Sequence, residues 1–173
     1  MLLLVRIPAE PSRHRVAAWR ELRRAGAVPV TQGAWLMPRA PLFLEAEQKI
    51  RELAERGTGD VLTLTVADTD EAAEALAAAF TAARLNEWSE FRSDCEKFED
   101  EIAKEIRIEK FTLAELEEEE QSLERLRRWY RDLKLRDVLS LPEAGAAEER
   151  LKGCTEAFEG YSELVYRAMN GTS

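Results

Sequence analysis

The residues best suited to chemistry near the start of the chain are arginines. Five of them are predicted to lie on one helix or at its start: Arg13, Arg15, Arg20, Arg23 and Arg24. A guanidinium group presents paired N–H donors that engage two oxygens of a phosphate or another tetrahedral oxyanion at once. Free N–H groups at the helix N-terminus would add to such a site. These arginines are therefore candidate anion- or nucleic-acid-binding residues, and the alternative is that they form a solvated helix face.

A second group consists of carboxylates on two long predicted helices. If these helices are antiparallel about a turn near Lys110, a divalent-cation site for metal-dependent hydrolysis would draw on Glu101, Glu105, Glu115 and Glu119. The Glu-x-x-His pattern of di-iron bundles is absent, which disfavours that hypothesis. Like charges one turn apart destabilise a helix, so we prefer a structural interpretation in which cations neutralise the cluster. The candidate cations are Lys97, Lys104, Arg107 and Lys110.

Other catalytic patterns are missing from the sequence. His14 is the single histidine, which excludes multi-histidine metal sites and leaves little material for histidine-based catalysis. There is no glycine-rich nucleotide loop, nucleophile elbow or Ser/His/Asp set. Cys95 and Cys154 lie in helical segments without CxxC spacing, which is typical of buried thiols. We expect a protein that is not an enzyme and needs no cofactor.

The first part of the chain alternates short apolar runs with helical patterns. Pro8 ends the first run, Ser12 is a plausible N-cap, Gly26 follows the first helix, and Gly33 suits a hairpin at positive φ. The second helix begins at Pro41. The predicted elements are strand 2–7, helix 12–25, strands 28–31 and 34–37, helix 41–56 and strand 61–66. This βαββαβ order is that of a ferredoxin-like module, an antiparallel sheet with both helices on one face.

From residue 69 onward the sequence predicts only helices. Three capping boxes mark their starts, Asp68 with Glu71, Thr112 with Glu115, and Ser140 with Glu143. Apolar residues recur at alternating spacings of three and four, the pattern of helices that pack along a seam. In the second helix Glu119 and Glu120 occupy a seam step where an apolar residue is expected. The predicted architecture is α+β, with a ferredoxin-like module over residues 1–68 and an antiparallel bundle over residues 69–173, its helices covering about 69–109, 112–136 and 141–169.

Charge is distributed unevenly between these two parts. Residues 1–69 carry 10 Lys and Arg against 8 Asp and Glu, whereas residues 70–173 carry 15 against 26, and the whole chain has a net charge of −9. A polyanion would therefore meet a favourable surface only on the first part. The apolar start is too short for a signal peptide, and no apolar run has the length that crosses a bilayer. We expect a cytoplasmic protein that does not enter a membrane.

The order of several segments resembles the N-terminal region of ChrB-type chromate-resistance proteins. The segments of the first part are LLLVRIP, RVAAWRELRRAGA and GAWLMP. Those of the second part are SEFRSDCEKFEDEIAKE, KFTLAELEEEEQSLERLRRW and a later C-x-x-x-F-E-x-(F/Y). The resemblance covers essentially the whole chain, although full-length relatives often carry an additional C-terminal domain. The first part is also similar in topology to modules of CRISPR adaptation nucleases and phenylacetate-type repressors, but the Asp that the nucleases need is replaced by Ile7 or Pro8.

The resemblance implies a role in chromate-responsive expression or tolerance, without catalysis. Chromate is a tetrahedral dianion, so Arg15 and Arg20 are chemically sensible ligands for chromate or sulfate. The hypothesis is a regulatory or accessory protein whose arginine face contacts an oxyanion or DNA. In that hypothesis the acidic helices mediate dimerisation or partner binding. The alternative is an interaction or dimerisation module that has no small ligand, such as one that forms a homodimer.

Overall fold

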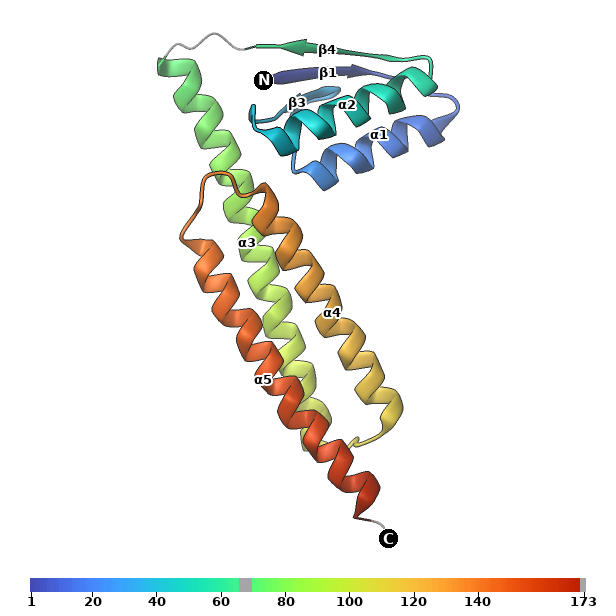
Figure 1. The fold of residues 1–173 in the computed structure, drawn as a ribbon, viewed down its shortest axis with the longest axis vertical. Coiled ribbons are helices and arrows are strands. Elements are labelled where there is room, and N and C mark those ends of the chain that lie inside the picture. The colour runs from blue at the N-terminus through green and yellow to red at the C-terminus, as the bar shows by residue number, and fades with distance from the viewer. Residues whose placement is uncertain (66–69, 172–173) are drawn as a thin grey trace. The chain divides into compact units, whose positions relative to one another are not determined.

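The computed structural model describes residues 1–65 and 70–171, and the chain divides into two compact units, Met1–Ala83 and Arg84–Ser173. The elements of the first unit are β1 (Leu2–Arg6), α1 (Ser12–Ala25), β2 (Val28–Thr31), β3 (Ala34–Leu36), α2 (Pro41–Arg56), β4 (Asp60–Leu64) and the start of α3 (Asp70–Arg107). The rest of α3, α4 (Leu113–Arg136) and α5 (Glu143–Asn170) make the second unit (Figure 1). The protein is α+β, and the described strands all lie in the first unit.

The four strands form one antiparallel sheet in the order β2-β3-β1-β4. In the centre, Leu3 of β1 lies beside Trp35 of β3 and Thr63 of β4. α1 and α2 lie side by side on one face of the sheet (Figure 1). The core between them is apolar and includes the fully buried Leu3 and Ile50. The predicted succession of strand, helix, two strands, helix and strand is confirmed.

Most of the predicted turn residues act as expected in the first unit. Gly26 ends α1 in the left-handed conformation at a φ of 78°, and Gly33 has a φ of 77° in the hairpin. α2 begins at Pro41. The predicted Ser12 cap is wrong, because Pro11 occupies the N-cap position and Ser12 is already helical. A proline side chain offers no oxygen to accept a hydrogen bond from the helix, so α1 has no side-chain cap.

The boundary between the predicted parts falls where the chain is only partly described. Val66 and Asp68, the expected end of the last strand and the first helix cap, lie outside the described residues. The compact units divide between Ala83 and Arg84. Phe80 of α3 packs edge-on against Phe43 of α2 with ring centroids 5.9 Å apart, which ties the start of α3 to the first unit.

The second unit is a bundle of the three long helices with one shared apolar core. Trp88, Cys95 and Ile102 of α3 are buried in that core. The α4 residues are Leu123, Leu126 and Leu133, and the α5 residues are Ala144, Ala147, Cys154, Tyr161 and Val165. These are mostly the residues of the predicted seams, so packing follows the spacing of three and four. None of the helices among the described residues has both the length and the apolar character needed to cross a membrane.

The two remaining capping boxes have different outcomes. The Thr112 side chain accepts a hydrogen bond from the Glu115 backbone N–H at 3.3 Å, as predicted. The box of Ser140 with Glu143 is wrong. Ser140 adopts a positive φ of 53°, and α5 begins after Pro142 without a side-chain cap. In the preceding loop, the Asp137 carboxylate accepts a hydrogen bond from the Leu141 backbone N–H at 3.1 Å.

Candidate anion-binding cavity

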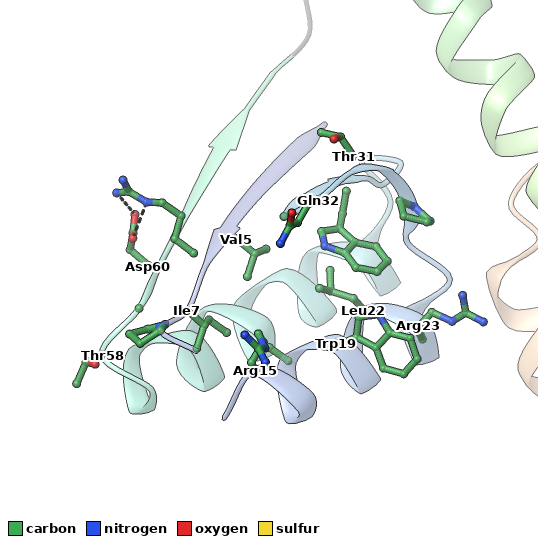
Figure 2. A pocket seen from close by; sticks show the side chains of 17 residues that line it. Val5, Ile7, Arg15, Trp19, Leu22, Arg23, Thr31, Gln32, Thr58 and Asp60 are labelled. Atoms are coloured by element: carbon green, nitrogen blue, oxygen red, sulfur yellow. Dashed lines mark hydrogen bonds and ion pairs between the residues drawn. The ribbon is translucent and has the colours of Figure 1, made fainter. Parts of the chain in front are cut away.

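A cavity of about 840 Å³ opens at one end of the sheet in the first unit. Four segments form its walls: the end of β1, the side of α1 that carries Arg15, Trp19 and Leu22, the β2–β3 hairpin, and the turn from α2 into β4. Figure 2 shows Arg15 and Trp19 on α1, Gln32 on the hairpin, Thr58 in the α2–β4 turn and Asp60 at the start of β4. The cavity therefore brings together residues that are far apart in the sequence.

Arg15, Trp19 and Arg23 form the helical wall of this cavity. Their spacing of four places them along one face of α1, since residues four apart lie nearly above one another. The Trp19 side chain is 50% exposed, and the Arg23 guanidinium carbon lies 5.4 Å from the centre of its ring, within the range of a cation–π contact. α1 thus presents a row of cation, aromatic ring and cation.

The cavity lining has a net positive charge because its acidic residue, Asp60, is already paired. The Arg6 guanidinium donates to both carboxylate oxygens of Asp60, at 3.0 and 2.9 Å, and this hydrogen bonding lowers the pKa of Asp60. Arg15 and Arg23 form no ion pair with any described carboxylate. Two guanidinium charges therefore remain at the cavity wall without an acidic partner among the described residues.

The other three predicted arginines do not line the cavity. Arg13 is exposed and its Nε donates to the His14 ring at 3.2 Å. Arg20 is also exposed and lies outside the cavity lining. Arg24 pairs with Glu21 at 2.5 Å, and Lys49 contacts the same carboxylate at 3.1 Å. Burial opposes ionisation of Glu21, but these two cations outweigh it and lower the pKa of that carboxyl.

Two glycines let the backbone close the cavity at its rim. A Cβ added to Gly33, which has a positive φ, would come within 3.0 Å of the Val5 carbonyl oxygen. At Gly59 an added Cβ would lie 2.1 Å from the Arg6 carbonyl oxygen, which no structure tolerates. Both glycines line the cavity, so the close approach of the hairpin and of the α2–β4 turn to β1 depends on the absence of a side chain at each.

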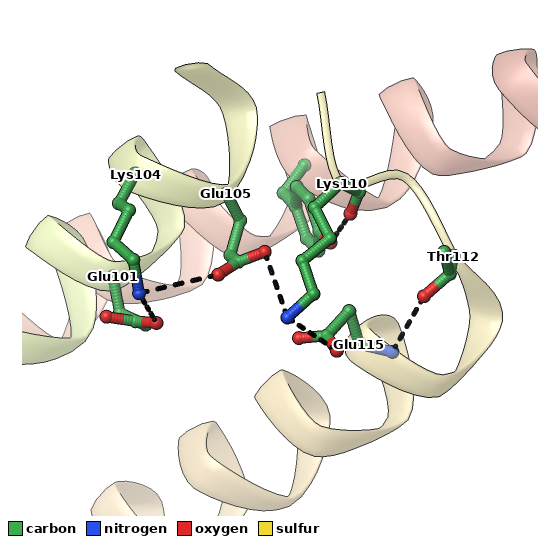
Figure 3. A network of polar contacts seen from close by, with 7 residues as sticks. Glu101, Lys104, Glu105, Lys110, Thr112 and Glu115 are labelled. Carbon is green, nitrogen blue, oxygen red and sulfur yellow. Dashed lines mark hydrogen bonds and ion pairs between the residues drawn. The ribbon is translucent and has the colours of Figure 1, made fainter. Parts of the chain in front are cut away.

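The carboxylate cluster of the second unit is an ion-pair network (Figure 3). Lys104 Nζ lies 2.6 Å from a Glu101 oxygen and 3.7 Å from Glu105, while Lys110 Nζ lies 3.6 Å from Glu105 and 2.7 Å from Glu115. Within residues 1–65 and 70–171, no group of three or more acids, cysteines or histidines is placed to hold a metal ion. Lys104 and Lys110 therefore pair with three of the four predicted acids, as the structural interpretation expected, whereas Glu119 forms no ion pair with a described residue.

The other two predicted cations do not join the network, and only one of the two seam glutamates is buried. Lys97 pairs with Asp94 at 2.7 Å instead of joining the network, and no ion pair within the described part of the chain involves Arg107. Glu119 occupies the seam and is only 6% exposed, whereas Glu120 is exposed. Burial is the main cause that raises the pKa of Glu119, and the nearby Glu101 and Glu118 carboxylates add to the shift.

Cys95 and Cys154 lie within the bundle core as free, buried thiols. The Cys154 thiol donates to the Cys95 carbonyl oxygen with a sulfur–oxygen distance of 3.5 Å. The contact with the Cys154 thiol and burial raise the pKa of the Cys95 thiol. The predicted role of both cysteines as buried apolar residues is confirmed.

Sequence reasoning found the arginines of the cavity but missed its aromatic and polar walls. On α1, Val16 and Trp19 are exposed, whereas Leu22 is buried. Gln32 and Trp35 also line the cavity. A signal for Trp19 was present, since Arg15 and Arg23 stand four residues on either side of it and charged neighbours along one helix face indicate a face open to solvent.

Comparison with known protein families identifies a match. The family model described as "Protein ChrB, N-terminal" matches residues 15–172, nearly the whole chain. No curated protein and no solved structure matches the chain. The matched range begins at Arg15, on the cavity wall of α1.

Proposed function

Because the chain belongs to the family of ChrB N-terminal regions, we propose that it is a regulatory or accessory protein of chromate resistance whose first unit binds an oxyanion. The family relates the chain to chromate resistance, and the strand order β2-β3-β1-β4 with two helices on one face supports a ferredoxin-like module as the binding unit. The protein is then a cytoplasmic sensor or accessory component without catalytic activity.

The observation that carries this proposal is the pair of cavity arginines. Arg15 and Arg23 face a concave space and have no carboxylate partner among the described residues. Chromate and sulfate are tetrahedral dianions whose oxygens match the paired N–H donors of a guanidinium group. A cavity wall lends these contacts more strength than open solvent does, because the local dielectric constant is lower.

Calorimetric titration with chromate and with sulfate tests the oxyanion site. We expect both anions to bind and sulfate to compete with chromate. Arg15→Ala and Arg23→Ala should each weaken binding about tenfold or more, since a hydrogen bond to a charged group contributes about 1.5–3 kcal/mol. Arg20→Ala is the matched control, because this arginine lies on the same helix but outside the cavity. Equal affinity in all four proteins would dismiss the site.

Contact with DNA through the first unit is part of the same proposal. Arg13 and Arg20 are exposed on α1 and have no ion pair with a described carboxylate, so they are available to phosphates. Affinity that rests on phosphate contacts falls steeply with salt. A gel shift on the DNA upstream of the gene, with and without chromate, should give a complex that Arg13→Ala and Arg20→Ala weaken. A complex of equal strength in these variants would locate DNA binding elsewhere.

The second candidate function is homodimerisation, and the open face of the sheet favours it. Leu62 and Leu64 of β4 alternate with the helix-facing Val61 and Thr63, and they are 52% and 41% exposed. A self-complementary apolar patch is the usual basis of a twofold dimer. Light scattering should then show a dimer that Leu62→Glu converts to a monomer. A monomer at high concentration without any mutation would count against this function.

A further inference from the structure

The size of the cavity does not match a bare oxyanion. A tetrahedral anion has the bulk of a few water molecules of about 30 Å³ each, whereas the cavity holds about 840 Å³. Cavities of roughly 300–1,000 Å³ with a few polar groups on apolar walls are typical of organic ligands. An oxyanion at the arginines would leave most of the space, including the tryptophan side, filled only with water.

The remaining walls suit a flat aromatic ring. Trp19 exposes half of its side chain beside the cavity, and the neighbouring apolar surface comes from Leu22, Pro29 and Trp35. An exposed tryptophan is a stacking surface for a ring, and every nucleobase offers such a face. From the hairpin, Gln32 reaches the cavity with an amide that both donates and accepts hydrogen bonds (Figure 2).

The spacing along α1 sets the distance between ring and charge. Trp19 stands four residues from Arg15 and four from Arg23, which corresponds to a rise of about 6 Å in each direction. Arg23 already lies against the Trp19 ring, so Arg15 is the arginine better placed to take a separate anionic group. A ligand that stacks on Trp19 would carry its charge one short linker away from the ring.

We propose that the cavity binds a nucleoside monophosphate, with its base stacked on Trp19 and its phosphate on Arg15. This class of ligand combines a flat base, a sugar of suitable length and a tetrahedral oxyanion. The net positive charge of the cavity complements the phosphate, because Asp60 is neutralised by Arg6. The inference rests on the proposed function, because Arg15 is the proposed ligand of chromate and, in this inference, of the phosphate group of a larger molecule.

Calorimetry on the full chain with inorganic phosphate, adenosine and adenosine monophosphate tests the inference. We expect adenosine monophosphate to bind at least tenfold more tightly than either phosphate or adenosine. Trp19→Leu keeps an apolar side chain at a half-exposed position and should reduce binding of the monophosphate to the level of phosphate. Trp19→Phe should restore most of the gain, and Arg15→Ala should weaken binding of phosphate and monophosphate alike.

The outcomes separate this inference from the oxyanion site. Equal affinities for phosphate and adenosine monophosphate, or a gain that survives in Trp19→Leu, would overturn the nucleotide and leave an arginine-dependent oxyanion site standing. If the unmodified protein bound neither phosphate nor adenosine monophosphate, both proposals would be wrong. A short oligodeoxyadenylate that binds far more tightly than the monophosphate, with the same dependence on Trp19, would also overturn the free nucleotide in favour of a single strand.

Discussion

At the scale of single residues, the least expected feature is a carboxylate in the seam of the bundle. Glu119 is 6% exposed, and beyond the effect of burial its pKa is raised further by carboxylates of α3, such as Glu101, and of its own helix, such as Glu118. Glu105 is even more buried, but Lys104 and Lys110 approach it on both sides. Glu119 therefore differs from its neighbours, because its environment favours the protonated form.

Glu119→Gln should stabilise the protein at neutral pH. Since the pKa of Glu119 is raised in the folded state, its contribution to stability is complete below the unfolded pKa of about 4.3 and is lost as pH rises through the folded pKa. The gain at pH 7 should be at least ~0.2–0.5 kcal/mol, the cost of one like-charge pair such as that with Glu115. Urea unfolding at several pH values measures it.

The control for this prediction is Glu120→Gln, which removes the same charge from an exposed position of α4. The two variants should differ in stability at pH 7 and converge with the unmodified protein near pH 4. A gain for Glu119→Gln that is the same at pH 4 and pH 7 would contradict the raised pKa.

The buried cysteines permit a second prediction at this scale. Cys95 and Cys154 are both 0% exposed, and burial together with the contact between the thiols raises the pKa of Cys95. Because a reagent cannot reach either buried sulfur, a coloured thiol reagent should label neither cysteine in the native protein and both after unfolding in urea. The absorbance of the released chromophore, followed with and without urea, measures the labelling. Rapid labelling under native conditions would contradict the packing.

At the scale of the elements, two glycines of opposite environment give a paired test. A Cβ at Gly160 in the middle of α5 would meet nothing within 4 Å, whereas one at Gly59 would collide with the Arg6 backbone. Gly160→Ala should stabilise the protein by about 0.5–1 kcal/mol, the helix propensity difference. Gly59→Ala should destabilise it, because β4 must move away from β1. Thermal unfolding of both variants compares them, and a shift in the same direction for both would contradict this packing.

The elements themselves were largely predictable from the sequence, because local signals determine them. Pro41, Gly26 and Gly33 fix turns through their own backbone preferences, and the structure has each where the pattern indicated it. The Ser12 and Ser140 caps failed for a local reason too. A cap depends on the φ and ψ of one residue. Pro11 holds the cap position of α1 in place of Ser12, and Ser140 has a positive φ that the extended conformation of a cap does not allow.

The cavity was beyond such reasoning, because it depends on contacts between distant segments. Periodicity identified Arg15 and Arg23 as surface residues of a helix, but not which of the five arginines share a concave wall. The hairpin and the α2–β4 turn reach α1 only through sheet pairing and through the close approach at Gly59. The lysine network was easier to foresee, since Lys104 lies one helical turn from Glu101.

At the scale of the whole molecule, the chain consists of two units with separate cores. The first core includes residues from Leu3 to Phe80, and the second includes residues from Trp88 to Val165. Among the described residues, none belongs to both cores. The first unit holds the candidate cavity and the second the acidic ion-pair network, so these two features lie in parts with independent hydrophobic cores.

We therefore expect fragments 1–83 and 84–173 to fold separately. Each fragment retains a complete apolar core, and burial of apolar surface is the main favourable contribution to folding. Fragment 84–173 should show the circular dichroism of a helical bundle and a cooperative thermal transition. Amide spectra of each fragment should overlay those of the full chain except near the cut within α3.

A fragment 84–173 without dispersed amide signals would mean that its core depends on the first unit. Binding of sulfate by fragment 1–83 with the affinity of the full chain would place the anion site within that unit alone.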